Sequence, residues 1–127
     1  MKAKFSKSWK SSIQPRKQKK YAANAPLHIK GKMISSHLSK DLRVKHKTRS
    51  ISLRVGDKVK VLRGNRKGEE QRVERINKKS QKVYLEKTEF TKKDGSKATK
   101  PFNASNLMIV VLNTDDKRRL KRTKGEK

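Results

Sequence analysis

The sequence predicts a mainly β fold in which residues 51–112 form a small barrel. Four apolar stretches in that region are typical of strands, and they cover residues 51–62, 73–76, 83–85 and 107–112. Asp94-Gly95 is a hairpin-turn signal, so strands are also expected through Thr91 and Thr99 on either side of it. Short strands joined by tight turns favour closure into a barrel, because a closed sheet leaves no unpaired edge.

The two ends of the chain are highly charged and poor in apolar residues. Residues 1–25 are rich in Lys, Ser, Gln and Ala, and we predict that they form a basic extended arm. Residues 113–127 form a charged tail in which Asp115 and Asp116 precede a run of cations. Acids before cations match the dipole of a helix, so this tail is predicted to contain a short C-terminal helix.

Residues 26–50, between the arm and the barrel, are predicted to form short helices. Pro26 suits a first helical turn. Ser39 can cap a second helix, and Asp41 then lies in its first turn. A helical pair of this size cannot stand alone, so it is expected to need the β domain or a partner for its stability.

The charge of the chain indicates a polyanionic partner. Its 127 residues include 38 Lys and Arg but only 11 Asp and Glu, which gives a formal net charge of +27. Residues 1–50 hold 15 of the basic residues and a single acid, Asp41. So large a charge repels itself in a compact state. The least apolar segment is also the most cationic, and this is typical of an arm that becomes ordered only on its partner.

The composition also excludes several classes of protein. The chain has no cysteine, which removes disulfides and thiolate chemistry. The first residues contain no apolar core of the kind found in signal peptides, and no stretch approaches the roughly 20 apolar residues that cross a bilayer. The sequence therefore predicts a soluble intracellular protein without a membrane partner.

Signals for metal binding and catalysis are missing from the sequence. His28, His37 and His46 are nine residues apart and match no common zinc spacing. The chain has no Gly-x-Ser-x-Gly elbow, and the loop from Gly64 to Gly68 lacks the Gly-Lys-Ser/Thr ending of a nucleotide-binding loop. We predict no enzyme activity, no cofactor, no metal and no small-molecule substrate.

The most informative stretch is a strand followed by a tight basic loop. Apolar residues alternate with cations from Leu53 to Val61, which indicates a strand with one cationic face. The run then stops at Arg63-Gly64-Asn65-Arg66-Lys67-Gly68. The glycines at both ends allow a sharp turn, and the cations and the amide between them suit phosphate oxygens. The alternative is that this loop is a solvent-exposed turn without a role in binding.

This stretch resembles the KOW motif, which has an apolar strand, Gly-Asp, alternating valines, a Gly-x-x-x-Gly loop and a return strand. The motif alone suggests either ribosomal or transcription-elongation proteins. The preceding segment is similar to one family, in Asn24-Ala25-Pro26-Leu27-His28-Ile29-Lys30 and His37-Leu38-Ser39-Lys40-Asp41-Leu42-Arg43. That family is the archaeal and eukaryotic branch of the KOW-type large-subunit ribosomal protein, number twenty-four in the bacterial series and twenty-six in the eukaryotic one. The resemblance covers most of the chain, but Gln71 stands where the family usually has glycine.

The resemblance implies a fold, a role and a place. The fold is an SH3-like barrel, the KOW domain. The role is that of a structural protein in the cytoplasmic large ribosomal subunit, which binds rRNA near its 5′ end, lies close to the nascent-chain exit and assists early subunit assembly. The implied partners are large-subunit rRNA and neighbouring ribosomal proteins near the exit tunnel.

Candidate RNA contacts come from the arm, the helical segment and the loop. Cations can bind phosphate, and an aromatic ring such as that of Trp9 can stack on a base or pack locally. The predicted contacts are Lys7, Trp9, Lys10, Arg16, Lys17, Lys19, Lys20, His28, Lys30, Lys32, Arg49, Ser50, Arg63, Asn65, Arg66 and Lys67.

Two other functions would also account for the charge. A transcription-elongation factor would explain the loop, but it would normally carry a separate polymerase-binding domain, for which this chain has no room. A DNA-compacting protein of the chromatin type would explain the net charge of +27 but neither family motif.

Overall fold

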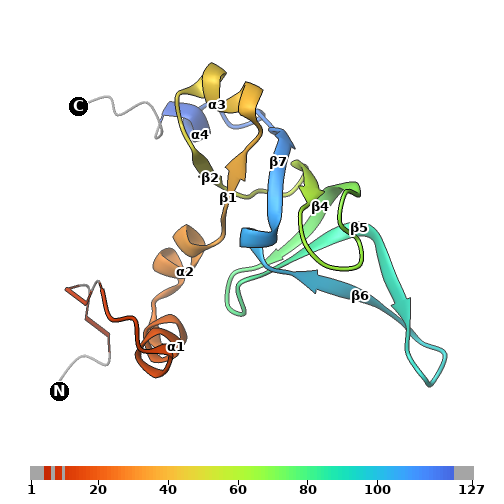
Figure 1. Cartoon of the computed structure of the whole chain (residues 1–127), viewed down its shortest axis with the longest axis horizontal. Helices are drawn as coiled ribbons and strands as arrows, with labels where there is room; N and C mark the ends of the chain where they lie inside the picture. Colours follow the sequence, from red (N-terminus) through yellow and green to blue (C-terminus); the bar gives the residue numbers. More distant parts are fainter. Residues whose placement is uncertain (1–4, 7, 10, 122–127) are drawn as a thin grey trace.

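Seven strands form one sheet in the computed structural model, which describes residues 5–6, 8–9 and 11–121. The strands are β1 (Ser35–Leu38), β2 (Ser50–Ser52), β3 (Lys58–Val61), β4 (Glu70–Asn77), β5 (Lys82–Thr91), β6 (Lys97–Phe102) and β7 (Leu107–Val111). Their order is β2-β1-β7-β3-β4-β5-β6 (Figure 1). The predicted mainly β fold is confirmed. Within the described residues the sheet stays open, with β2 and β6 at its edges, so closure into a barrel is not confirmed.

Strand β4 joins two parts of the sheet, and the hydrophobic core lies where these parts meet. The first residues of β4 pair with β3, while the residues from Val73 onward pair with β5, with an irregular register between Val73 and Arg75. Strands on both sides of this point contribute buried apolar side chains. The core consists of Ile34, Leu38, Ile51, Leu53, Val59, Val61, Val73, Val83, Leu85, Phe102, Ala104, Leu107, Ile109 and Leu112.

Most of the predicted strands are present. Residues 73–76 lie in β4, residues 83–85 lie in the first half of β5, and residues 107–111 form β7. The turn at Asp94-Gly95 joins β5 to β6, with a hydrogen bond from the Lys92 amide to the Ser96 carbonyl of 2.9 Å. The hairpin prediction is therefore confirmed.

The prediction of one strand over residues 51–62 is wrong, because the chain turns between β2 and β3. The turn is closed by the carboxylate of Asp57, whose Oδ2 accepts a 2.8 Å hydrogen bond from the Arg54 amide. Gly56 has φ of +89°, and a Cβ there would lie 2.8 Å from the Nδ2 atom of Asn113. Val55, expected on the apolar face, is exposed as a result.

Residues 26–50 contain two helices, α2 (Leu27–Met33) and α3 (Lys40–His46), as predicted. The prediction of helices alone is wrong, however, for Ser35–Leu38, which form β1. This strand pairs antiparallel with β2 and parallel with β7, and Ser36 and Leu38 point into the core. Residues before position 51 therefore belong to the sheet.

The arm is not extended throughout, because Pro15–Asn24 form helix α1. Pro15 occupies the first position of the helix. An amide hydrogen at that position has no acceptor within the helix, so proline, which lacks one, suits the helix start. No residue of α1 is buried, and its ten residues fall short of the ~12–15 that make an isolated helix stable. A hydrogen bond of 3.1 Å from Lys30 Nζ to the Ala23 carbonyl links its end to α2.

The predicted C-terminal helix is present as α4 (Arg118–Lys121). It is joined to the domain by a buried ion pair. The two Nη atoms of Arg119 donate to the two carboxylate oxygens of Asp57 at 2.6 Å each, and the side chains are 3% and 0% exposed. Arg119 also donates to the carbonyls of Asn113 and Ser52, at 2.8 and 3.0 Å. The tail is thus part of the folded unit as far as α4.

Candidate nucleic-acid interface

The predicted basic loop lies between β3 and β4, and its backbone is fixed. Gly64 and Gly68 have φ of +93° and +94°, a conformation that glycine adopts without steric cost. The Gly68 amide donates to the Val61 carbonyl at 2.8 Å, and the Lys67 amide donates to the Gly64 carbonyl at 3.1 Å. The side chains of Arg63, Asn65 and Lys67 are exposed, so the loop presents two cations and an amide to solvent. This arrangement suits phosphate contacts.

Arg66 differs from the other loop cations, because it contacts the protein itself. Its Nη1 lies 3.2 Å from Glu69 Oε2 and 3.4 Å from the Lys87 carbonyl, and its Nη2 lies 3.4 Å from the Glu89 carbonyl. Its side chain is 30% exposed. Arg66 therefore connects the loop to β5, and Arg63 and Lys67 remain the accessible cations.

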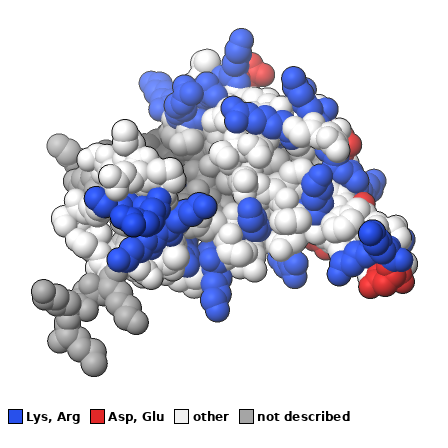
Figure 2. All heavy atoms as spheres, turned by 60° about the horizontal axis from the view of Figure 1, so that its bottom comes forward, with Lys and Arg blue, Asp and Glu red and all other residues white. Residues whose placement is uncertain are grey.

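The second predicted area is the basic surface of α1. Arg16, Lys17, Lys19 and Lys20 are all exposed on it. Figure 2 shows Lys and Arg side chains spread over one face of the molecule with few acidic groups among them. Trp9 packs against Tyr21 of α1, with ring centroids 4.6 Å apart. The predicted contacts Lys7 and Lys10 lie outside the described residues.

A third area joins α2 to the edge of the sheet. Two hollows of about 280 and 700 Å³ share Lys32, Ser52 and Arg54 among their lining residues. Ser50 lines the smaller hollow and His28 the larger one. The structure thus brings together three predicted contact residues, Lys32, His28 and Ser50.

The sequence analysis missed three cations that line the larger hollow, Arg54, Arg75 and Lys78. Arg54 forms an ion pair with Asp116 at 2.6 Å, and this hydrogen bond lowers the pKa of Asp116. The guanidinium carbon of Arg75 lies 4.3 Å from the ring centroid of Tyr84, within cation–π range. Their signal in the sequence was weak, because only Arg75 belongs to a strand, whereas Arg54 and Lys78 lie just outside the strands, and no spacing indicates that the three line one hollow.

The remaining predicted residues lie at the borders of these areas. Lys30 is half-buried and bonds to the carbonyl of Ala23, whereas Arg49 is exposed next to β2. Burial lowers the pKa of His37, and the nearby charges of Arg43 and Arg49 lower it further. The neutral form of His37 is therefore favoured near pH 7, and the positive charge around Arg49 comes from the arginines.

The described residues carry no grouping suited to metal chemistry. Within residues 5–6, 8–9 and 11–121, no three side chains that could ligate a metal ion lie close together. In the same part of the chain, none of the helices has the length and apolarity needed to cross a membrane.

Comparison with known proteins identifies the family. Residues 12–124 match the family of ribosomal proteins described as L26 in eukaryotes and as number 24 in archaea. The chain belongs to this family. It is also similar to the large ribosomal subunit protein uL24 of Methanospirillum hungatei, with 42% identity over 115 residues, which cover 91% of this chain and 96% of that protein. The resemblance in the sequence to this branch of ribosomal proteins is confirmed.

Family membership also bears on two points raised by the sequence. Ribosomal proteins of this family are structural, which agrees with the prediction that the chain is not an enzyme. Gln71, a position at which the resemblance leads us to expect glycine, pairs with Val59 in the regular β3–β4 ladder. A regular strand residue needs no positive φ, so the strand accepts the glutamine.

Proposed function

We propose that this protein is a structural constituent of the cytoplasmic large ribosomal subunit and that it binds rRNA there. Its family and its similarity to a large-subunit protein over 91% of the chain support the first statement. The statement that it binds rRNA rests on where the exposed cations lie. They lie on α1, beside the two hollows next to α2, and on the loop between β3 and β4. The protein does no chemistry, and its partners are rRNA and neighbouring ribosomal proteins.

The three basic areas support binding to more than one RNA segment. Figure 1 places α1 at the lower left, while the loop between β3 and β4 lies near the middle of the view, beside β4 and β5. Cations in separate areas can neutralise phosphates of RNA segments that would otherwise repel each other. Bringing such segments together is the contribution that a structural protein makes to assembly.

We place the contact near the 5′ end of the large-subunit rRNA, close to the nascent-chain exit, and assign the protein an early role in assembly. These details follow from the family resemblance, as does an SH3-like barrel for the β domain. The change of partner along β4, with its irregular register between Val73 and Arg75, is compatible with such a barrel.

Binding to rRNA fragments tests this function. The full chain should bind a fragment from the 5′ region of large-subunit rRNA more tightly than a 3′ fragment of equal length at the same salt concentration. A filter-binding or gel-shift titration measures both affinities. Equal affinity for the two fragments would contradict the assigned location and leave only general polyanion binding.

Removing the two accessible loop cations should cost more binding than removing two cations of α1. The double variant Arg63→Ala/Lys67→Ala should lower the slope of log affinity against log salt by roughly 1.4–1.8, since each lost phosphate contact contributes about 0.7–0.9. The loop is already ordered, so its side chains lose less entropy on binding than those of the unpacked α1.

The matched control is Arg16→Ala/Lys19→Ala, which also removes one arginine and one lysine. We expect a smaller loss from this pair at fixed salt, with circular dichroism showing an intact fold in both variants. Equal losses would contradict the argument from loop rigidity and favour bulk charge.

A further inference from the structure

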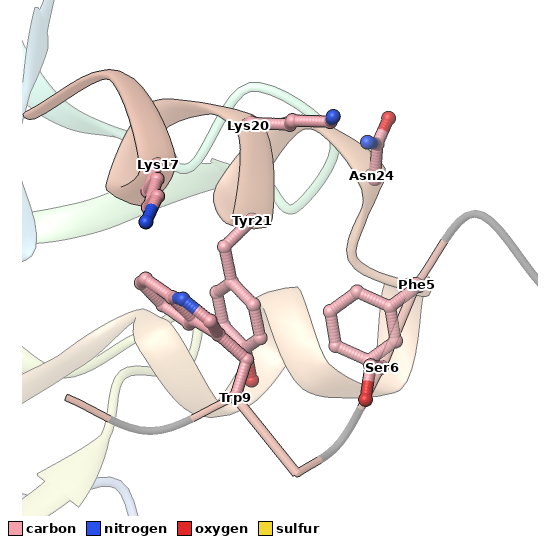
Figure 3. Close-up of a pocket in the computed structure, with 7 residues that line it drawn as sticks. All are labelled: Phe5, Ser6, Trp9, Lys17, Lys20, Tyr21 and Asn24. Carbon is pink, nitrogen blue, oxygen red and sulfur yellow. The ribbon is translucent and has the colours of Figure 1, made fainter. Parts of the chain in front are cut away.

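Three aromatic rings gather against α1, in the least apolar part of the chain. The ring of Tyr21 lies 4.9 Å from that of Phe5 and 4.6 Å from that of Trp9, centroid to centroid. Figure 3 shows Tyr21 between the other two rings. The whole chain has only six aromatic residues, so half of them meet at this one place. We name Phe5, Trp9 and Tyr21 the aromatic cluster.

The aromatic cluster borders a cavity whose remaining lining is polar or cationic. The cavity has a volume of about 270 Å³, and Lys17, Lys20 and Asn24 of α1 also line it. Figure 3 shows the two lysines and the asparagine on the helix side of the rings. The volume lies just below the ~300–1,000 Å³ of pockets for drug-sized ligands, which suits a single flat ring system.

Packing alone does not account for this arrangement. The three rings are only half-buried, and none of them belongs to the hydrophobic core. Helix α1 has no buried residue, so the aromatic cluster does not fix it to the β domain. Exposed aromatic surface next to two cations is instead the combination with which proteins hold single-stranded nucleic acid.

We propose that this cavity receives one unstacked nucleobase of the rRNA. The base stacks on an aromatic face, and Lys17 and Lys20 bind the phosphates on either side of it. Asn24 offers both a donor and an acceptor to the base edge. The proposal rests on the proposed rRNA binding and adds the site at which a base, rather than the backbone, is recognised.

Trp9 is the only tryptophan of the chain, so its fluorescence reports on this cavity alone. The full chain is titrated with a single-stranded RNA oligonucleotide and with an oligonucleotide of the same length and charge whose nucleotides are abasic. The RNA should quench Trp9 and bind about 5- to 140-fold more tightly than the abasic strand, the range that corresponds to ~1–3 kcal/mol for one stacked base. The abasic strand should leave the fluorescence unchanged.

Variants assign the effect to the aromatic cluster, with binding followed by the anisotropy of labelled RNA. Trp9→Ala should bring the affinity for RNA close to that for the abasic strand, and Trp9→Phe should retain most of the difference. Ile13→Ala is the control, because Ile13 is an apolar side chain of the same segment that is 89% exposed. It should behave as the unmodified protein does.

The outcomes separate this proposal from the one on which it rests. Equal affinity for the two strands, without quenching, would overturn the nucleobase site and leave rRNA binding standing. Absence of binding to either strand at low salt would overturn both. A loss of RNA affinity in Ile13→Ala as large as in Trp9→Ala would also overturn the site, because the loss would then come from the whole segment.

Discussion

Raising the salt concentration from about 50 to about 200 mM should lower the affinity for rRNA about 10³- to 10⁵-fold. This range applies to proteins that neutralise roughly 6–10 phosphates, since each contact releases a bound counterion. Among the predicted contacts, eight exposed cations make no ion pair within the described part of the chain, which falls inside that range. These cations are Arg16, Lys17, Lys19, Lys20, Lys32, Arg49, Arg63 and Lys67.

The measurement is a series of binding titrations at increasing potassium chloride, with circular dichroism at each step to show that the fold is unchanged. A slope equivalent to one or two contacts would contradict the prediction. Most of the positive charge would then have no part in binding, and the net charge of +27 would need another explanation.

Removing the carboxylate of Asp57 should lower the free energy of unfolding by about 3–5 kcal/mol. The variant Asp57→Asn leaves the guanidinium of Arg119 buried without a counter-charge. Asp57 also accepts hydrogen bonds from the amides of Arg54 and Asn113, both at 2.8 Å. Total stabilities of small domains are about 5–15 kcal/mol, so the loss is a large part of the whole. Urea unfolding measures it.

Glu89→Gln is a matched control, because Glu89 also loses a charge that pairs with a cation. Its partner Lys97 is 3.8 Å away and both side chains are mostly exposed, so the expected change is ~0–1 kcal/mol. The double variant Asp57→Asn/Arg119→Met removes both buried charges and should recover part of the lost stability. Similar small effects from Asp57→Asn and Glu89→Gln would show that the buried pair does not hold α4.

The parts of the fold that could be predicted are those with local signals. The loop from Gly64 to Gly68 has two glycines at a fixed spacing after a strand of alternating valines and lysines, and both adopt the positive φ that such a turn requires. The β5–β6 hairpin was predictable from the Asp94-Gly95 dipeptide for the same reason.

The parts that could not be predicted depend on partners far away in the sequence. Strand β1 has only four residues, Ser-Ser-His-Leu, and it becomes a strand because β2 and β7 pair with it. Arg119 lies in a run of charge that is typical of a solvated tail, yet its partner Asp57 is 62 residues earlier.

The candidate site was predicted by residue type but not by geometry. A cation in a basic loop is expected to face solvent, and Arg63 and Lys67 do so. Arg66 contacts carbonyls of β5, which only the folded chain brings near. Likewise, the contacts of the Tyr21 ring with Phe5 and Trp9 depend on the helix at Pro15–Asn24. The sequence there has no apolar periodicity that would predict a helix.

The parallel pairing of β1 with β7 has a consequence for the newly made protein. In the sheet β7 lies between β1 and β3, so a chain that ends before Leu107 has two separate pieces of sheet. At ~5–20 residues per second, the stretch from the start of β1 to the end of β7 takes roughly 4–15 seconds to synthesise. During this time the cationic first 50 residues have no completed domain to join and are exposed to any polyanion. The last strand to be made is thus the one that unites the domain.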